Sequence, residues 1–223
     1  MKNIGILSLI SLFLWTNVKS QEQTWKTIPY YLKGYETEYA ESPKKAALAW
    51  FKDARFGLFV HWGPAALYEK GEWVMYNKRI PFEGYVQTAK KFKGEKFNAK
   101  DYIDLAVKAK MKYITFVAKH HDGYALWDSK ATDYDSMDYP AHRDFLKELA
   151  DACRKAGLGL FIYYSIGIDW HHPYFLPNTM YDPARPHYAE IPAAYKYEKE
   201  EDFKHYLNFA KTQTMELCTQ YGP

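Results

Sequence analysis

Three short apolar segments set the hydrophobic pattern of this chain. They span residues 55–62 (RFGLFVHW), 113–117 (YITFV) and 158–165 (LGLFIYYS). β-Branched and aromatic side chains dominate them and no polar face alternates along them, which is typical of strands buried on both faces. The pattern therefore predicts three buried strands of a parallel sheet.

Amphipathic segments alternate with these strands. Ser42 and Pro43 predict the N-cap and first turn of one helix, Asn98 caps a second, and Asp144 begins a third that ends at Gly157. A fourth helix lies close to the end of the chain. Helical spacing places these residues on the inner faces of the four helices: Ala46, Ala47, Trp50 and Phe51; Tyr102, Ile103, Ala106 and Val107; Phe145, Leu146, Leu149, Ala150 and Cys153; Phe203, Tyr206, Leu207, Ala210, Thr214, Leu217, Cys218 and Tyr221.

The segments that follow the strands are much longer than those that precede them. Residues 65–96 and 173–192 are predicted as loops, and the ionisable clusters come after strands rather than before them. A (β/α)8 barrel shows this asymmetry, because its βα loops carry the site. An open doubly wound sheet has the same alternation, but it normally has a Gly-rich first turn that this sequence lacks.

We therefore predict an α/β fold: the N-terminal portion, about three βα units, of a (β/α)8 TIM-type barrel. Three strands cannot close an eight-stranded barrel, so the barrel is expected to be incomplete and its third strand to be an exposed apolar edge. Residues 42–223 would form this part of the barrel domain, and residues 21–41 a lead-in segment that wraps it.

The first 20 residues have the features of a secretory signal peptide. Lys2 precedes an apolar run over residues 4–15, and Val18 and Ser20 occupy the positions before a cleavage point. The run is short for a membrane span, although an uncleaved anchor is the alternative. We expect an exported protein, periplasmic, secreted or, in a eukaryote, lysosomal, with no membrane attachment after cleavage.

Composition narrows the function classes. The net charge of +3 over 223 residues, without a basic stripe, argues against nucleic acid as a partner. Twenty-one Tyr, 13 Phe and seven Trp could pack against sugar rings or fill a core. Cys153 and Cys218 are predicted to be buried, unpaired side chains on helix inner faces.

Ionisable residues at the ends of the predicted strands are the candidate chemistry. His61 ends the first strand, and Lys119, His120, His121 and Asp122 end the second. Because sites form at the carboxyl ends of parallel strands, we predict that His120 and His121 line an active site. Asp122 is expected to brace the histidine loop through backbone hydrogen bonds.

Two further histidines follow the third predicted strand. We interpret His171 and His172 as solvated loop residues.

Four motifs in this order resemble the α-L-fucosidases of glycoside hydrolase family 29. They are ARFGLFVHWGP (residues 54–64), GEWV (71–74), KHHDGYALWDS (119–129) and IYYSIGIDW (162–170), and the similarity runs from about Pro43 to the end of the chain. The resemblance implies a retaining exo-glycosidase that releases terminal α-L-fucose from oligosaccharides or glycoproteins. It implies no cofactor and no catalytic metal.

The resemblance also implies a fucose-binding set. Imidazoles, a carboxylate and a phenol can each bond to sugar hydroxyls, and an indole can contact the methyl group of fucose. The spacing after Arg143 favours Tyr163 over Tyr164 for the phenol. The implied substrate-binding residues are His61, Glu72, Trp73, His120, His121 and Tyr163.

Neither catalytic carboxyl group is expected within this sequence. Retaining hydrolysis uses two carboxyl groups about 5 Å apart. The resemblance places the nucleophile, an Asp, at the end of a fourth strand, and the acid/base, a Glu, further on, so both are expected beyond Pro223. Glu72 is the only pocket carboxylate that the sequence indicates.

Three hypotheses follow. The chain is part of a fucosidase, a catalytically inactive fragment or fucose-binding remnant, or a metal-dependent hydrolase with His61, His120 and His121 as ligands. Against the third, adjacent residues of a strand point to opposite faces, which would separate His120 from His121.

Overall fold

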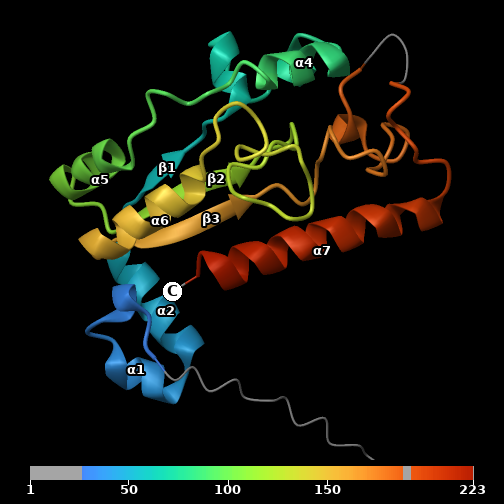
Figure 1. Ribbon diagram of the computed structural model, residues 1–223. Coiled ribbons are helices and arrows are strands. Elements are labelled where there is room, and N and C mark those ends of the chain that lie inside the picture. The colour runs from blue at the N-terminus through green and yellow to red at the C-terminus, as the bar shows by residue number, and fades with distance from the viewer. Residues whose placement is uncertain (1–26, 188–191, 223) are drawn as a thin grey trace, which may run out of the picture.

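A three-stranded parallel sheet lies at the centre of the computed structural model, which describes residues 27–187 and 192–222. The strands are β1 (Leu58–Val60), β2 (Tyr113–Lys119) and β3 (Gly159–Tyr164), in the order β1-β2-β3 (Figure 1). The predicted α/β organisation and the three parallel strands are confirmed. The predicted signal peptide lies outside the described residues.

The four predicted helices are α2 (Pro43–Ala54), α5 (Ala99–Lys108), α6 (Phe145–Ala156) and α7 (Phe203–Gln220). Asn98 accepts a hydrogen bond from the backbone N–H of Lys100, and Asp144 accepts one from that of Lys147, so both predicted caps are confirmed. Gly157 ends α6 in the left-handed conformation, with a φ of 70°. Ser42 is the N-cap of α2, but its side chain makes no capping bond.

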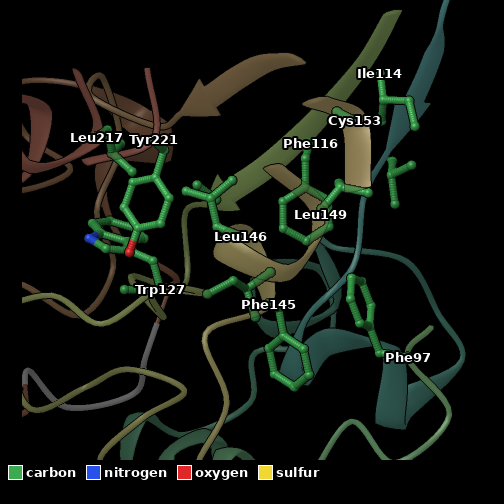
Figure 2. Packing of buried hydrophobic residues seen from close by; sticks show 14 of the residues in the cluster. Phe97, Ile114, Phe116, Trp127, Phe145, Leu146, Leu149, Cys153, Leu217 and Tyr221 are labelled. Atoms are coloured by element: carbon green, nitrogen blue, oxygen red, sulfur yellow. The ribbon is translucent and has the colours of Figure 1, made fainter. Parts of the chain in front are cut away.

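One face of the sheet carries the main core. The inner residues of α6 pack against Ile114 and Phe116 of β2 and, together with Trp127, against Leu217 and Tyr221 at the end of the chain (Figure 2). All five residues predicted for the inner face of α6 are buried: Phe145, Leu146, Leu149, Ala150 and Cys153. Helix α7 runs beside β3 (Figure 1), and the Tyr164 hydroxyl donates to Gln213 on it.

The other face of the sheet is only partly covered, by Trp50 and Phe51 of α2, which contact Tyr113 and Phe161. For β1 and β3 the prediction of strands buried on both faces is therefore wrong. Phe59, Thr115 and Phe161 are aligned across the three strands. Phe59 is 53% exposed and Phe161 is 37% exposed. The apolar pattern of β1 and β3 therefore does not reflect burial by the described residues, and β3 is the exposed apolar edge expected for it.

Half of the region over residues 65–96 is helical, which corrects its prediction as a loop. It contains the 3-10 helix η2 (Pro64–Tyr68) and the helices α3 (Val74–Asn77) and α4 (Phe82–Ala89). Val74, Met75 and Tyr85 of this region are buried in one cluster with Trp170 from the loop after β3, whereas Ala89 and Phe92 belong to the main core. This packing holds short helices that have little stability of their own.

The lead-in segment also contains short helical turns. They are η1 (Tyr30–Leu32) and α1 (Glu36–Glu41), and they lie with α2 at the amino-terminal end of the sheet (Figure 1). Two further 3-10 turns, η3 (Asp182–Ala184) and η4 (Glu200–Asp202), precede α7.

Some predicted inner-face residues point outward. Cys218 is exposed, which corrects its prediction as a buried side chain, whereas Cys153 is buried. Phe51, Val107 and Leu207 are each about half exposed. On α7 the reason is visible: buried Gln213 and Glu216, both polar, share the inner face with Tyr206, Ala210 and Leu217.

Among the helices of residues 27–187 and 192–222, none combines the length and apolar character that a bilayer crossing requires.

Candidate active site

A pocket lies at the carboxyl end of the sheet, where the loops after β1 and β2 meet. His61, Glu72, His120 and Asp122 supply its ionisable groups. Its apolar wall comes from these residues: Trp62, Pro64, Ala65, Ala66, Val117, Tyr124 and Leu126. This is the end of a parallel sheet at which α/β enzymes carry their sites.

Each of the three strands brings one aromatic ring to this end. His61 follows β1, His120 follows β2, and Tyr163 lies within β3. The ring centroids of His61 and His120 are 5.8 Å apart, and those of His61 and Tyr163 are 6.3 Å apart. The Tyr163 ring is 6.2 Å from that of His120. Tyr164 instead donates its hydroxyl to Gln213 on α7, so Tyr163 is the tyrosine that faces the histidines.

Glu72 completes the cluster from the loop before α3. One oxygen or nitrogen atom from each of His61, Glu72 and His120 lies within 4.8 Å of the other two. Three predicted residues that are far apart in the sequence are therefore neighbours.

His121 and Trp73 form the wall beside this cluster. The His121 ring centroid is 4.0 Å from that of His120 and 4.8 Å from that of Trp73. His121 is nearly buried, and its Nδ1 shares a 2.6 Å hydrogen bond with the hydroxyl of Ser165. The expectation that His120 and His121 point to opposite faces is wrong, because β2 ends at Lys119 and the chain then turns.

Burial keeps both histidines uncharged at neutral pH. It lowers the pKa of His120 to about 4, although the carboxylate of Glu72 acts in the opposite direction. Burial and the neighbouring His120 ring together lower the pKa of His121 to about 3. A neutral imidazole has one nitrogen that donates and one that accepts, which suits it to a hydroxylated ligand.

Asp122 braces the histidine loop and also reaches the pocket. It is buried, accepts a backbone hydrogen bond from Tyr124, and accepts a 2.6 Å hydrogen bond from the Tyr85 hydroxyl. The predicted backbone brace is confirmed, but Glu72 is not the only pocket carboxylate. Burial raises the pKa of Asp122 to about 6. The Tyr85 partner was missed because Tyr85 lies in the region interpreted as a loop.

A buried ion pair behind the histidines was not predicted. Lys119 donates to Asp169 at 2.5 Å, and both side chains are almost completely inaccessible. The ammonium also lies 4.4 Å from the ring centroid of Tyr164. Burial lowers the pKa of Lys119; it would raise that of Asp169, but the Lys119 ammonium holds the pKa of this carboxyl low. In the sequence, the signal that could have indicated this ion pair is the position of Lys119 at the end of an apolar strand.

The same carboxylate organises the loop after β3. Asp169 accepts hydrogen bonds from the backbone N–H groups of His171 and His172, at 3.1 and 2.8 Å. His171 stacks on Tyr134 with ring centroids 3.8 Å apart, and burial lowers the pKa of His172 to about 4. These histidines are packed in the structure, which corrects their interpretation as solvated loop residues.

Replacing Glu72 with Gln should lower the pKa of His120 further. The Glu72 carboxylate stabilises the imidazolium form, so its removal disfavours protonation. The measurement is an NMR titration of the His120 ring, with a midpoint near pH 4 before the change and below it in E72Q. E83Q, on the exposed surface of α4, removes one carboxylate elsewhere and should leave the midpoint in place. A midpoint that rises in E72Q contradicts the assignment.

The fold and the site together define the class: an α/β protein with a polar pocket at the carboxyl end of a parallel sheet, as in barrel enzymes. The family model described as alpha-L-fucosidase matches residues 23–223. The chain belongs to this family, glycoside hydrolase family 29, and its predicted family membership is confirmed.

Relatives and solved structures agree with this assignment. Tissue alpha-L-fucosidase from Bos taurus is 31% identical over 159 residues, which are 64% of this chain and 34% of that protein. Alpha-L-fucosidase isoenzyme 1 from Paenibacillus thiaminolyticus is 38% identical with a TM-score of 0.66, over 78% of this chain and 40% of that chain. Alpha-L-fucosidase AlfC from Lactobacillus casei, in complex with alpha-L-fucose product, is 34% identical with a TM-score of 0.67, over 78% and 58%. The chain spans about a third of the length of the curated relatives it matches.

Proposed function

We propose that this chain is the fucose-binding part of a retaining alpha-L-fucosidase that acts on terminal α-L-fucose of oligosaccharides or glycoproteins. The observation that carries the proposal is the convergence of His61, Glu72 and His120 within 4.8 Å at the carboxyl end of the sheet. Family membership supplies the substrate class, since the AlfC structure contains alpha-L-fucose product.

The cluster suits a sugar by its chemistry. Neighbouring hydroxyl groups of a pyranose each donate and accept, so they need donors and acceptors at short spacing. Neutral His120 offers one of each, Glu72 only accepts, and the Tyr163 hydroxyl does both. In this proposal Trp73 and His121 form the wall against which the apolar side of fucose packs.

The sheet is proposed to be part of a (β/α)8 barrel. Its site lies at the carboxyl end of the strands, as in such barrels. The partly covered face with Phe59 and Phe161 is apolar, which suits the interior of a barrel that further strands would close. We also propose that residues 1–20 are removed during export.

Turnover is proposed to need carboxyl groups outside these 223 residues. Retaining hydrolysis uses two carboxyl groups about 5 Å apart. Of the two carboxylates in the described part of the pocket, Asp122 is buried and bonded to Tyr85 and Tyr124, which leaves Glu72. This observation also supports the second candidate, a fucose-binding chain without activity of its own.

Binding of L-fucose by the isolated chain, measured by titration calorimetry, tests the proposal. We expect H120A and E72Q each to weaken binding by about tenfold or more, since each loses a hydrogen bond to the sugar. E83Q should bind as the unaltered chain does. D-fucose, the mirror image of the ligand, should bind much more weakly because the polar groups are fixed in space.

Two outcomes count against the proposal. Equal affinity for L- and D-fucose would contradict a specific sugar site. Undiminished binding of L-fucose by both H120A and E72Q would contradict the assignment of that site to this pocket. Release of nitrophenol from 4-nitrophenyl α-L-fucopyranoside by the 223-residue chain would refute the claim that the catalytic carboxyl groups lie elsewhere.

A further inference from the structure

The three converging side chains of the pocket have polar atoms without partners. Across residues 27–187 and 192–222, the buried Nδ1 of His120 has no hydrogen-bond partner. Within that same part of the chain, no hydrogen bond or ion pair engages Glu72 or His61. Two neighbouring groups are occupied, since His121 bonds to Ser165 and Asp122 bonds to Tyr85, whereas the buried Tyr124 hydroxyl in the pocket wall also has no partner among the described residues. Of these three side chains, His61 is exposed and Glu72 and His120 are half-buried, and the buried atom without a partner is Nδ1 of His120. An unmade hydrogen bond at a buried polar atom points to a ligand.

The spacing of these groups fits a single metal ion. Their nearest ligand atoms lie within 4.8 Å of one another, and the His61 and His120 ring centroids are 5.8 Å apart. Tetrahedral zinc has bonds of about 2.0–2.2 Å to nitrogen and oxygen, so its ligand atoms are about 3.4 Å apart. Small side-chain rotations of the three groups would close the difference.

The donor set selects the kind of ion. Two imidazole nitrogens and one carboxylate oxygen are ligands that Zn²⁺ accepts, with a fourth position left open. Ca²⁺ and Mg²⁺ prefer oxygen ligands alone, so the two histidines select against them.

We propose that His61, Glu72 and His120 bind Zn²⁺ when the sugar is absent. The bound ion would prevent fucose from binding, because it occupies the place of the fucose hydroxyls. The ion and the sugar hydroxyls would compete for the same lone pairs on the two imidazoles and the carboxylate. The ion therefore acts as an inhibitor of sugar binding rather than as a cofactor. The proposal of a metal site depends on the positions of the three side chains. The proposal that zinc competes with fucose also rests on the proposed function. This set differs from the sequence hypothesis, because His121 is replaced by Glu72.

Calorimetric titration of ZnCl₂ into the tag-free 223-residue chain tests the site. We expect one equivalent to bind, with affinity lowered about tenfold or more in E72Q and in H120A, because each variant loses a ligand. Two control variants should retain the affinity of the unaltered chain: E83Q on α4, and H205Q on the exposed face of α7. MgCl₂ should give no binding heat. Circular dichroism shows whether each variant is folded.

A second titration, with saturating L-fucose present, tests the competition. A lower apparent affinity for Zn²⁺ is expected. Zinc binding that persists unchanged in both folded E72Q and H120A overturns the metal site, as does a failure to bind zinc by a chain that still binds L-fucose. Zinc binding that depends on Glu72 and His120 while L-fucose does not bind at all supports the metal site, and overturns the competition and the proposed function.

Discussion

Replacing Asp169 with Asn is expected to lower the free energy of unfolding by about 3–5 kcal/mol, since the change leaves a buried charge without its partner. The Lys119 ammonium is inaccessible to solvent and its hydrogen bond to Asp169 is 2.5 Å long. Asp169 also accepts hydrogen bonds from the backbone N–H groups of His171 and His172, so we expect the loop after β3 to become more mobile in this variant. Urea denaturation followed by circular dichroism measures the loss.

A surface ion pair provides the matched control for this prediction. Asp151 pairs with Lys147 and Arg154 on the exposed side of α6, and D151N should cost less than about 1 kcal/mol. The double variant K119M/D169N should recover part of the loss, since no unpaired charge remains. Equal effects of D169N and D151N would show that the buried pair has no special contribution.

Weaker binding of L-fucose should accompany the loss of stability in D169N. Lys119 ends β2 and immediately precedes His120, so the ion pair links the end of β2 to the loop after β3. When the pair is broken, the loop that holds the two pocket histidines loses one of its anchors. We therefore expect weaker L-fucose binding in D169N at urea-free conditions where the variant is still folded, and unchanged binding in D151N.

Truncating Trp127 to Ala should lower the free energy of unfolding by about 3–5 kcal/mol, since it empties a large volume in the core. Trp127 is fully buried in one cluster with Leu146, Leu217 and Tyr221 (Figure 2). Its indole N–H also donates to Glu216 on α7 at 3.0 Å. Urea denaturation gives the magnitude, and faster amide exchange in α7 is expected, because this contact joins α7 to the histidine loop.

The variant W127F separates the two contributions of this side chain. Phenylalanine keeps most of the apolar volume but cannot donate to Glu216, so W127F should cost about 1–3 kcal/mol. Glu216 would retain its bonds from the Ser129 hydroxyl and the backbone of Lys130. If W127A were no less stable than W127F, the packing of the ring would not be the main contribution of Trp127 to the free energy of unfolding.

Much of the site could be anticipated because its residues lie beside strong local signals. The strand before His120 is an apolar run, and Asn98 and Asp144 cap the helices on either side of it. His61, Glu72, Trp73, His120, His121 and Tyr163 were selected by resemblance of whole motifs, and the structure places each of them beside at least one of the others at one end of the sheet.

The same local signals were insufficient where burial depends on distant partners. The motif at residues 71–74 predicted Glu72 and Trp73, but the helices around it were not predicted. Val74 and Tyr85 of these helices are buried in one cluster with Trp170, which lies about 90 residues further along the chain. The apolar strands β1 and β3 looked buried on both faces, but Phe59 and Phe161 remain exposed on one of them. The hydrophobicity of a side chain indicates how much free energy its burial would contribute, but it does not indicate which part of the protein buries it.

The sequence by itself determined the order of the three strands and of the four longer helices α2, α5, α6 and α7, the caps that begin α5 and α6, the glycine that ends α6, and the family to which the chain belongs. These depend on neighbouring residues and on motif spacing, which the linear chain records directly. Only the tertiary structure decided which polar groups meet in the interior: Lys119 with Asp169, Tyr85 with Asp122, and His61 with Glu72 and His120. Such pairs join residues separated by long stretches of chain, so their contacts arise from loop packing, which no local periodicity encodes.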